Sequence, residues 1–259
     1  IRNIKKFSSI FCLANVPPPL YNKLNTIIFF HNRLLLNTFS HNISLKEKVI
    51  NLIKINYIKY YNQKHYNWVV QTPFMNKLLQ EDLMINSDQI STYPVFNEVL
   101  EISNSKKITN NFIYVSSSVS HKNHLRLIRA FIASANKTDK EIKLHLTLDK
   151  KELPKNAYPK NLKVEFHGTL SEEGVNGIYN INEFAIYPSL VESFGLPLIE
   201  SANHGCKVIA SDLQYVHEII KPSLTFDPYS IESISNAILK AIETDNLPET
   251  KVLVENKLD

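Results

Sequence analysis

A short stretch around residue 190 constrains the fold of this chain more than any other part. Residues 185–189 have the pattern of a buried strand, a loop follows, and a helix begins near Pro197. Gly195 permits positive φ before that helix, and Pro197 suits a first turn because its missing N–H is not needed there. Such a helix end attracts phosphate through its free N–H groups and its dipole. The stretch therefore predicts an anion-binding strand–turn–helix unit of an α/β fold.

Two carboxylates flank this turn. Glu200 lies about one turn inside the expected helix, where it could accept two hydroxyl hydrogen bonds of the kind a ribose diol offers. Glu192 lies in the loop, nearer to any group beyond the phosphates. The alternative is an ordinary strand–turn–helix connection with two solvated glutamates.

The run Pro188-Ser-x-x-Glu-x-Phe-Gly-Leu-Pro-x-x-Glu200 resembles the donor-binding signature of retaining, nucleotide-sugar-dependent glycosyltransferases of the GT-B fold, the group 1 or family 4 class. The resemblance implies an α/β protein with two Rossmann-like domains facing a cleft. It also implies that Glu200 holds the ribose and that Glu192 contacts the donor sugar. The other donor-binding residues that we expect are Ser193, Phe194, Gly195, Leu196 and Ser118.

A second part of the resemblance begins near residue 110. A strand, three serines (Ser116–Ser118) and a basic segment that contains His121 and Lys122 precede a helix. The resemblance implies that Lys122 neutralises the diphosphate. Members of the class often carry an Arg where this chain has the serines. The negative charge of the diphosphate is therefore less stabilised here, and His121 or the serine hydroxyls are the candidates to replace the Arg. The alternative for Lys122 is a solvated surface cation.

Strands alternate with helices along the chain, which indicates parallel sheets. We expect an N-terminal domain at 1–108, a donor domain at 109–245 and a tail at 246–259, with the polar stretch 97–111 as a linker. All five glycines lie between Gly168 and Gly205. A nucleotide-type domain normally carries glycines in its turns, so we expect the N-terminal domain to be incomplete.

Charge is distributed unevenly. Residues 1–80 hold eleven Lys and Arg and one acid, a net charge of +10, whereas the remainder carries −6. This asymmetry favours an anionic partner for the N-terminal part, such as a membrane surface with a phospholipid-like acceptor. Nucleic acid and a merely solvated surface are the alternatives. Arg33, Lys5 and Lys6 are the expected acceptor or anionic-surface residues.

Other residues complete the expectations. His31 follows two phenylalanines, and the resemblance implies that it contacts the donor sugar or the acceptor; a structural role is the alternative. The chain has no Asp-x-Asp and no Cys/His cluster, so we expect neither a metal nor another cofactor. Thr72 and Asp212 are expected to cap helices, and Trp68 is expected in the core. Cys12 and Cys206 are expected as reduced, mostly buried thiols.

The resemblance implies a retaining hexosyltransferase in which Glu192, Lys122 and His31 serve catalysis. It would move a hexose or N-acetylhexosamine, with UDP as the expected carrier, to a saccharide or undecaprenyl-diphosphate-linked acceptor. No apolar run is long enough to span a bilayer, and we expect a cytoplasmic protein attached peripherally to the plasma membrane. The alternatives are a sugar-nucleotide epimerase of the same fold, a non-catalytic donor-binding subunit that needs a partner, and a nucleic-acid binder. No aromatic stacking motif in the sequence supports the nucleic-acid binder.

Overall fold

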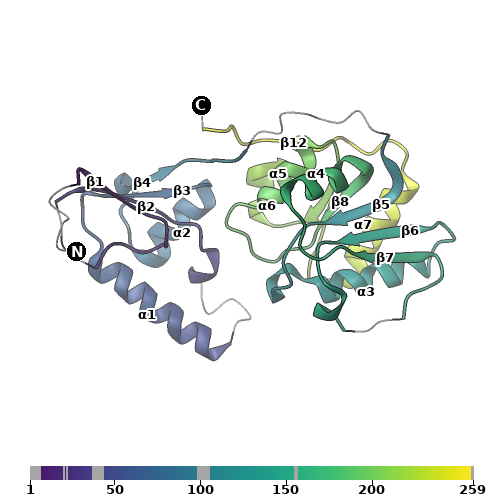
Figure 1. Cartoon of the computed structure of the whole chain (residues 1–259), viewed down its shortest axis with the longest axis horizontal. Helices are drawn as coiled ribbons and strands as arrows, with labels where there is room; N and C mark the ends of the chain where they lie inside the picture. The colour runs from purple at the N-terminus through teal and green to yellow at the C-terminus, as the bar shows by residue number, and fades with distance from the viewer. Residues whose placement is uncertain are drawn as a thin grey trace. The chain divides into compact units, whose positions relative to one another are not determined.

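The computed structural model shows two compact units, each built around a parallel β-sheet (Figure 1). This finding confirms the predicted α/β class. The first unit comprises Ile1–Phe96, Glu192–Phe194 and Glu255–Asp259, and the second comprises Asn97–Val191 and Gly195–Val254. The structure describes residues 7–19, 21, 23–36, 44–97, 106–154 and 157–257.

The first unit has a four-stranded sheet in the order β1-β2-β3-β4. Local signals explain its helices: Ser44 and Glu47 form a reciprocal capping box at α1, and the Thr72 hydroxyl accepts a hydrogen bond from the Met75 N–H at α2. Thr72 is therefore a helix cap, as predicted, and Trp68 is fully buried in the core. The elements are β1 (Ser9–Cys12), β2 (Asn25–Phe29), a 3-10 turn (Arg33–Leu35), α1 (Leu45–Tyr61), β3 (Tyr66–Val70), α2 (Pro73–Leu83), a 3-10 turn (Ser87–Gln89) and β4 (Ile90–Thr92).

The second unit has a six-stranded parallel sheet in the order β11-β9-β8-β5-β6-β7. A separate antiparallel pair joins β10 to β12. The strands are β5 (Ile108–Tyr114), β6 (Ile142–Leu146), β7 (Leu162–Phe166), β8 (Asn182–Tyr187), β9 (Lys207–Ser211), β10 (Ile220–Lys221), β11 (Leu224–Phe226) and β12 (Lys251–Val252). The helices are α3 (His124–Ala135), α4 (Glu172–Ile181), α5 (Leu196–Asn203), α6 (Gln214–Ile219) and α7 (Ile231–Glu243), with 3-10 turns at Ser120–Lys122 and Lys150–Glu152.

The path of the chain through this sheet reverses once. From β5 the chain runs outward through β6 to β7, and it then returns to β8 on the opposite side of β5 before it continues to β9 and β11. Helix α3 packs against α7, whereas α4 packs on β8 and α5 on β9 (Figure 1). Right-handed crossovers require this division, because reversing the direction of travel moves the connecting helix to the other face.

Two local expectations were wrong. The polar stretch expected as a linker through residue 111 contains the start of β5, where Asn110 takes a positive φ of 57° beside an irregular register with β8. This irregularity hides the alternation typical of a strand. Asp212 caps no helix: Leu213 precedes α6, and the Asp212 carboxylate instead pairs with His217 at 2.6 Å. Residues 98–105 of the expected linker lie outside the described residues.

Other expectations need smaller adjustments. The stretch expected as a tail contains β12, which a two-residue pattern could not reveal. Cys206 is buried, as expected, whereas Cys12 is only half-buried, and both are free thiols. Within the described ranges, none of the helices has the length and apolar content that crossing a bilayer requires.

Candidate functional site

The carboxyl ends of β5 and β8 form the topological switch point of the second sheet. These strands are neighbours, and the connection after β5 leads to α3 while the connection after β8 leads to α5. Open α/β sheets bind their ligands outside the carboxyl ends of the strands at such a point, because the two connections diverge to opposite faces. Lys122 follows β5, and the turn with Gly195 follows β8, so the fold brings two predicted parts of the site to one edge.

Hydrogen bonds hold these two loops together. The Tyr114 hydroxyl lies 2.9 Å from the Lys122 carbonyl oxygen, to which it donates, and 2.8 Å from the Ser189 hydroxyl. The Asn123 side-chain amide donates to the Pro188 carbonyl at 3.1 Å. Near them, the N–H of residue 190 donates to the carbonyl of residue 121 at 2.8 Å. Lys122 is thereby fixed beside the loop after β8, and its Nζ lies 5.9 Å from the centroid of the Tyr187 ring.

The amino end of α5 is built as the sequence predicts. Gly195 takes the left-handed conformation, with φ of 83°, and no side chain caps the helix there. Pro197 occupies the first turn, and Gly205, with φ of 73°, follows the end of the helix. The first turn carries no acidic residue, so the dipole and the N–H groups favour an anion at this end. Leu196, also predicted for donor binding, is exposed.

Glu200 lies on α5 one turn beyond Gly195 and is half-buried. Burial raises the pKa of its carboxyl group, and the charge of Glu172 raises it further. In the part of the chain that the structure describes, the Glu200 carboxylate has no hydrogen-bond or ion-pair partner. Both of its oxygens can therefore accept hydrogen bonds from a ligand.

Two of the three serines after β5 have side-chain partners within the second unit. Ser118 is exposed, and its hydroxyl hydrogen bonds to Glu152, which lowers the pKa of that carboxyl group. Ser116 lies 3.1 Å from Nε2 of His124, whose pKa is lowered by burial. Burial thus disfavours the charged form of His124, and Lys122 is a cation of this loop.

The remaining predicted residues belong to the first unit or lie outside the described residues. Glu192, Ser193 and Phe194 cluster with the first unit. His31 is exposed, and its backbone N–H donates to the side chain of Asn15 at 2.6 Å. Lys5 and Lys6 lie outside the described residues.

Arg33 is more deeply placed than an anion-binding surface residue. Its guanidinium donates to the Leu36 carbonyl at 3.1 Å and lies 5.2 Å from the centroid of the Phe74 ring. Burial lowers its pKa. These contacts show that part of the Arg33 guanidinium packs inside the first unit and stabilises the fold there.

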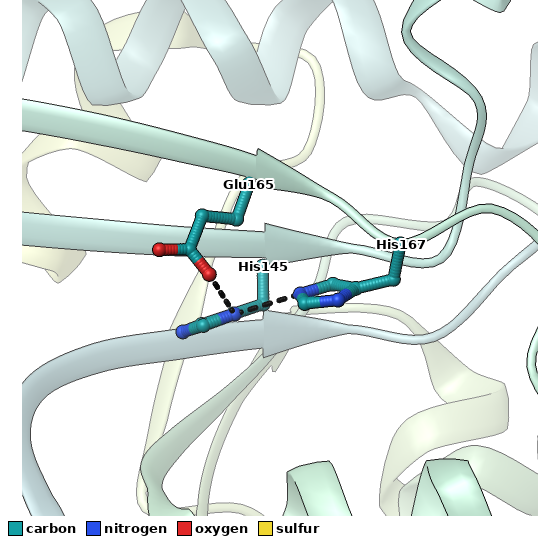
Figure 2. A group of neighbouring side chains, drawn as sticks. All are labelled: His145, Glu165 and His167. Atoms are coloured by element: carbon teal, nitrogen blue, oxygen red, sulfur yellow. Dashed lines mark hydrogen bonds and ion pairs between the residues drawn. The ribbon is translucent and has the colours of Figure 1, made fainter.

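One cluster was missed by the sequence analysis. His145, Glu165 and His167 place one ligand atom each within 4.8 Å of one another (Figure 2). Burial lowers the pKa of His145 to about 4. The Glu-x-His spacing on one strand was the available signal, but the third residue comes from another strand twenty positions away, which only the register reveals.

Comparison with known proteins matches residues 96–257 to the family model described as glycosyl transferases group 1. The chain is similar to "Probable sucrose-phosphate synthase 3" of Arabidopsis thaliana, with 37% identity over 98 residues, which are 35% of this chain and 8% of that protein. It is also similar to "O-antigen chain mannosyltransferase B" of Escherichia coli, with 29% identity over 87 residues, which are 33% of this chain and 23% of that protein. The matches thus span less than a quarter of either relative.

Solved structures share the fold. TarM superposes with a TM-score of 0.65 at 16% identity, covering 85% of this chain and 44% of TarM. A glycosyltransferase from Rickettsia africae superposes with a TM-score of 0.63 at 15% identity, covering 92% and 70% of the two chains. A mutant of S. aureus TarM has been solved with UDP. Likeness at this identity shows the fold alone, and it confirms the predicted GT-B class.

Proposed function

Because the chain belongs to the group 1 glycosyltransferases, we propose that it moves a hexose or N-acetylhexosamine from a nucleoside diphosphate sugar to a saccharide acceptor, with retention of anomeric configuration. UDP is the proposed carrier, and the UDP complex of a TarM mutant supports it. The proposed acceptor is a glycan or an undecaprenyl-diphosphate-linked saccharide of a cell-surface polysaccharide. The similarity to an O-antigen mannosyltransferase supports that choice.

The observation that carries the proposal is the convergence of Lys122, Gly195 and Glu200 at the switch point of the second sheet. Glu200 offers a carboxylate without a partner among the described residues, one helical turn from an uncapped amino end. In a nucleoside diphosphate the diphosphate is joined directly to the ribose. A carboxylate one helical turn from an anion-binding helix end can therefore bind the ribose while the helix end binds the diphosphate. The proposed order is therefore ribose at Glu200 and diphosphate at Gly195 and Lys122.

The proposed reaction breaks the bond between the anomeric carbon and the diphosphate oxygen and forms a bond from the same carbon to the acceptor oxygen. Lys122 and the N–H groups at the start of α5 stabilise the negative charge on the departing diphosphate, an electrostatic effect that often dominates catalysis. A donor phosphate oxygen takes the acceptor proton. Glu192 orients the sugar, His31 and Arg33 serve the acceptor, and no metal is assigned to the transfer.

Donor binding tests the proposal directly. Titration calorimetry with UDP should show saturable binding, and Glu200→Ala should weaken it by at least about tenfold, since two charge-assisted hydrogen bonds are lost. Glu173→Ala is the matched control, because Glu173 is an exposed carboxylate of α4. Equal UDP affinity in the wild type and in a folded Glu200→Ala variant would remove the basis of the proposal.

A non-catalytic donor-binding subunit is the second candidate. The observation in its favour is that Ser116, Ser117 and Ser118 supply no positive charge where the class often has an Arg, so the leaving group is less stabilised. Assays with a panel of nucleotide sugars separate the possibilities. Transfer to an acceptor supports the glycosyltransferase, turnover of the donor without an acceptor indicates an epimerase, and binding without turnover indicates the subunit.

Peripheral attachment to an anionic membrane is also proposed, and α1 of the first unit supports it. This helix exposes apolar side chains together with lysines, and of its seventeen residues Ile58 is the buried one. The exposed apolar residues are Leu45, Val49, Ile50, Leu52, Ile53 and Tyr60, and the lysines are Lys46, Lys48, Lys54 and Lys59. Each cation near an anionic leaflet contributes about 1 kcal/mol.

Sedimentation with vesicles tests this attachment. The chain should bind vesicles that contain phosphatidylglycerol and not vesicles of phosphatidylcholine alone, and salt should weaken the binding. A variant with Lys46→Gln and Lys54→Gln should bind the phosphatidylglycerol vesicles more weakly than the wild type at the same salt concentration. Binding that is equal for both lipid compositions would contradict the electrostatic argument.

A further inference from the structure

We propose that His145, Glu165 and His167 bind a divalent transition-metal ion, with Zn²⁺ as the best fit, at the carboxyl ends of β6 and β7. The site is separate from the residues assigned to the donor, and it would stabilise the edge of the second sheet. The cluster is shown in Figure 2, where the three side chains point toward one another.

The register of the sheet creates the cluster. His145 on β6 is paired directly with Glu165 on β7. His167 follows Glu165 by two residues, and its N–H donates to the Leu146 carbonyl at 2.9 Å, so the strand pairing continues past the end of β7. Residues two apart on a strand face the same side. All three side chains therefore leave the sheet on one face.

The distances suit tetrahedral coordination. Nδ1 of His145 lies 2.9 Å from Nε2 of His167 and 3.4 Å from a carboxylate oxygen of Glu165. In a tetrahedral zinc site with bonds of about 2.0–2.1 Å, ligand atoms are about 3.3 Å apart. The two distances from His145 Nδ1 are thus within about 0.5 Å of the tetrahedral value. All three ligand atoms lie within 4.8 Å of one another, so the Glu165 side chain would close on the ion, and water would fill the fourth position.

The donor types favour Zn²⁺ over Mg²⁺ or Ca²⁺. Two imidazole nitrogens and one carboxylate oxygen are typical zinc ligands, whereas the lighter cations prefer oxygen ligands alone. Lys143 lies on the same face, and its Nζ pairs with the other Glu165 oxygen at 3.1 Å. This ion pair holds the Glu165 carboxylate so that its second oxygen faces His145. The positive charge of Lys143 would, however, repel the metal ion.

His145 turns one ring nitrogen, Nδ1, toward Glu165 and His167. His145 is 4% exposed, and among the described residues its Nε2 has no hydrogen-bond partner. A metal bound at Nδ1 would not reach Nε2, so this buried nitrogen does not bear on the choice of ion, and the proposal depends on the three ligand atoms that converge. Glu165 and His167 are only partly buried, so an ion can enter from solvent.

The position of the cluster suggests what the metal does. Among the strands of the described residues, β7 lies at the edge of the sheet and pairs with β6 alone. A metal held by one residue of β6 and two residues of the β7 segment would clamp this edge. Because the ion would bind the folded chain, it would raise the melting temperature in proportion to the logarithm of its concentration above Kd.

Calorimetry on the untagged, chelator-treated full chain tests the proposal with Zn²⁺ alone. We expect one ion to bind per chain, and we expect Glu165→Gln and His167→Gln each to weaken that binding by at least about tenfold. Co²⁺ should give the intense visible absorption of a four-coordinate site, and both variants should lose it. Circular dichroism checks that the variants fold, which their partly exposed positions favour.

His217→Gln is the matched control, because His217 is an exposed histidine paired with Asp212. It should bind Zn²⁺ as the wild type does. Absence of saturable Zn²⁺ binding, binding that both cluster variants retain, or equal binding of Mg²⁺ would overturn the proposal. UDP binding is measured separately, so failure of the metal site leaves the proposed transferase function untouched.

Discussion

The same chemical change at two glycines is expected to alter the stability of the second unit in opposite directions. Gly195 has φ of 83°, and a Cβ added there would lie 3.2 Å from a methyl carbon of Leu198. A non-glycine residue in the left-handed region costs about 1–2 kcal/mol, and the close contact adds to that cost. Gly195→Ala should therefore lower the melting temperature by about 2–8 °C, at about 2–4 °C per kcal/mol for a unit of this size.

Gly177→Ala is the control for this prediction. Gly177 lies inside α4, and a Cβ built there meets nothing within 4 Å. Alanine in a helix interior is more stable than glycine by about 0.5–1 kcal/mol, so this variant should melt at a higher temperature than the wild type. Differential scanning calorimetry measures both shifts. A Gly195→Ala variant that melts at or above the wild-type temperature would refute the assignment of strain to this turn.

The two glycine variants are also expected to differ in ligand binding. Because Gly195 begins the proposed diphosphate site, Gly195→Ala should also weaken UDP binding, whereas Gly177→Ala should leave it unchanged. Calorimetric titration of the two folded variants makes the comparison. Weaker binding in both variants by the same factor would point to a global change and against a local role for Gly195.

Three further predictions concern stability. Glu200→Gln should stabilise the protein near pH 7, because burial raises the pKa of Glu200 above its unfolded value and makes the ionised form unfavourable in the fold; urea titrations should show this gain disappear as the pH falls below that unfolded value. Lys107→Met should cost about 1.5–3 kcal/mol by urea unfolding, since the amine donates to the carbonyls of Tyr179 and His204 at 2.7 Å each; an unchanged midpoint would argue that water replaces it. Ser44→Ala should cost about 1 kcal/mol by removing the α1 capping box, and Ser44→Asp should restore most of it if capping is the cause.

Local rules explain why the geometry of the turn at Gly195 and of the cap at Thr72 could be predicted. The positive φ of Gly195, the first-turn place of Pro197 and the cap at Thr72 each depend on residues within a few positions. The same rules failed where pairing decides the structure. The start of β5 near Asn110 is irregular, and Asp212 satisfies its carboxylate with His217 instead of a helix end.

The sequence by itself therefore determined the α/β class, the strand–turn–helix unit around Gly195 and the carboxylate at Glu200. The tertiary structure alone decided the strand order, which makes β5 and β8 neighbours and holds Lys122 to Ser189 through Tyr114. It also decided the register that joins His145 to Glu165. The physical reason is that side-chain periodicity reports which face of a strand is buried, whereas the partner of that strand depends on contacts between residues far apart in the chain.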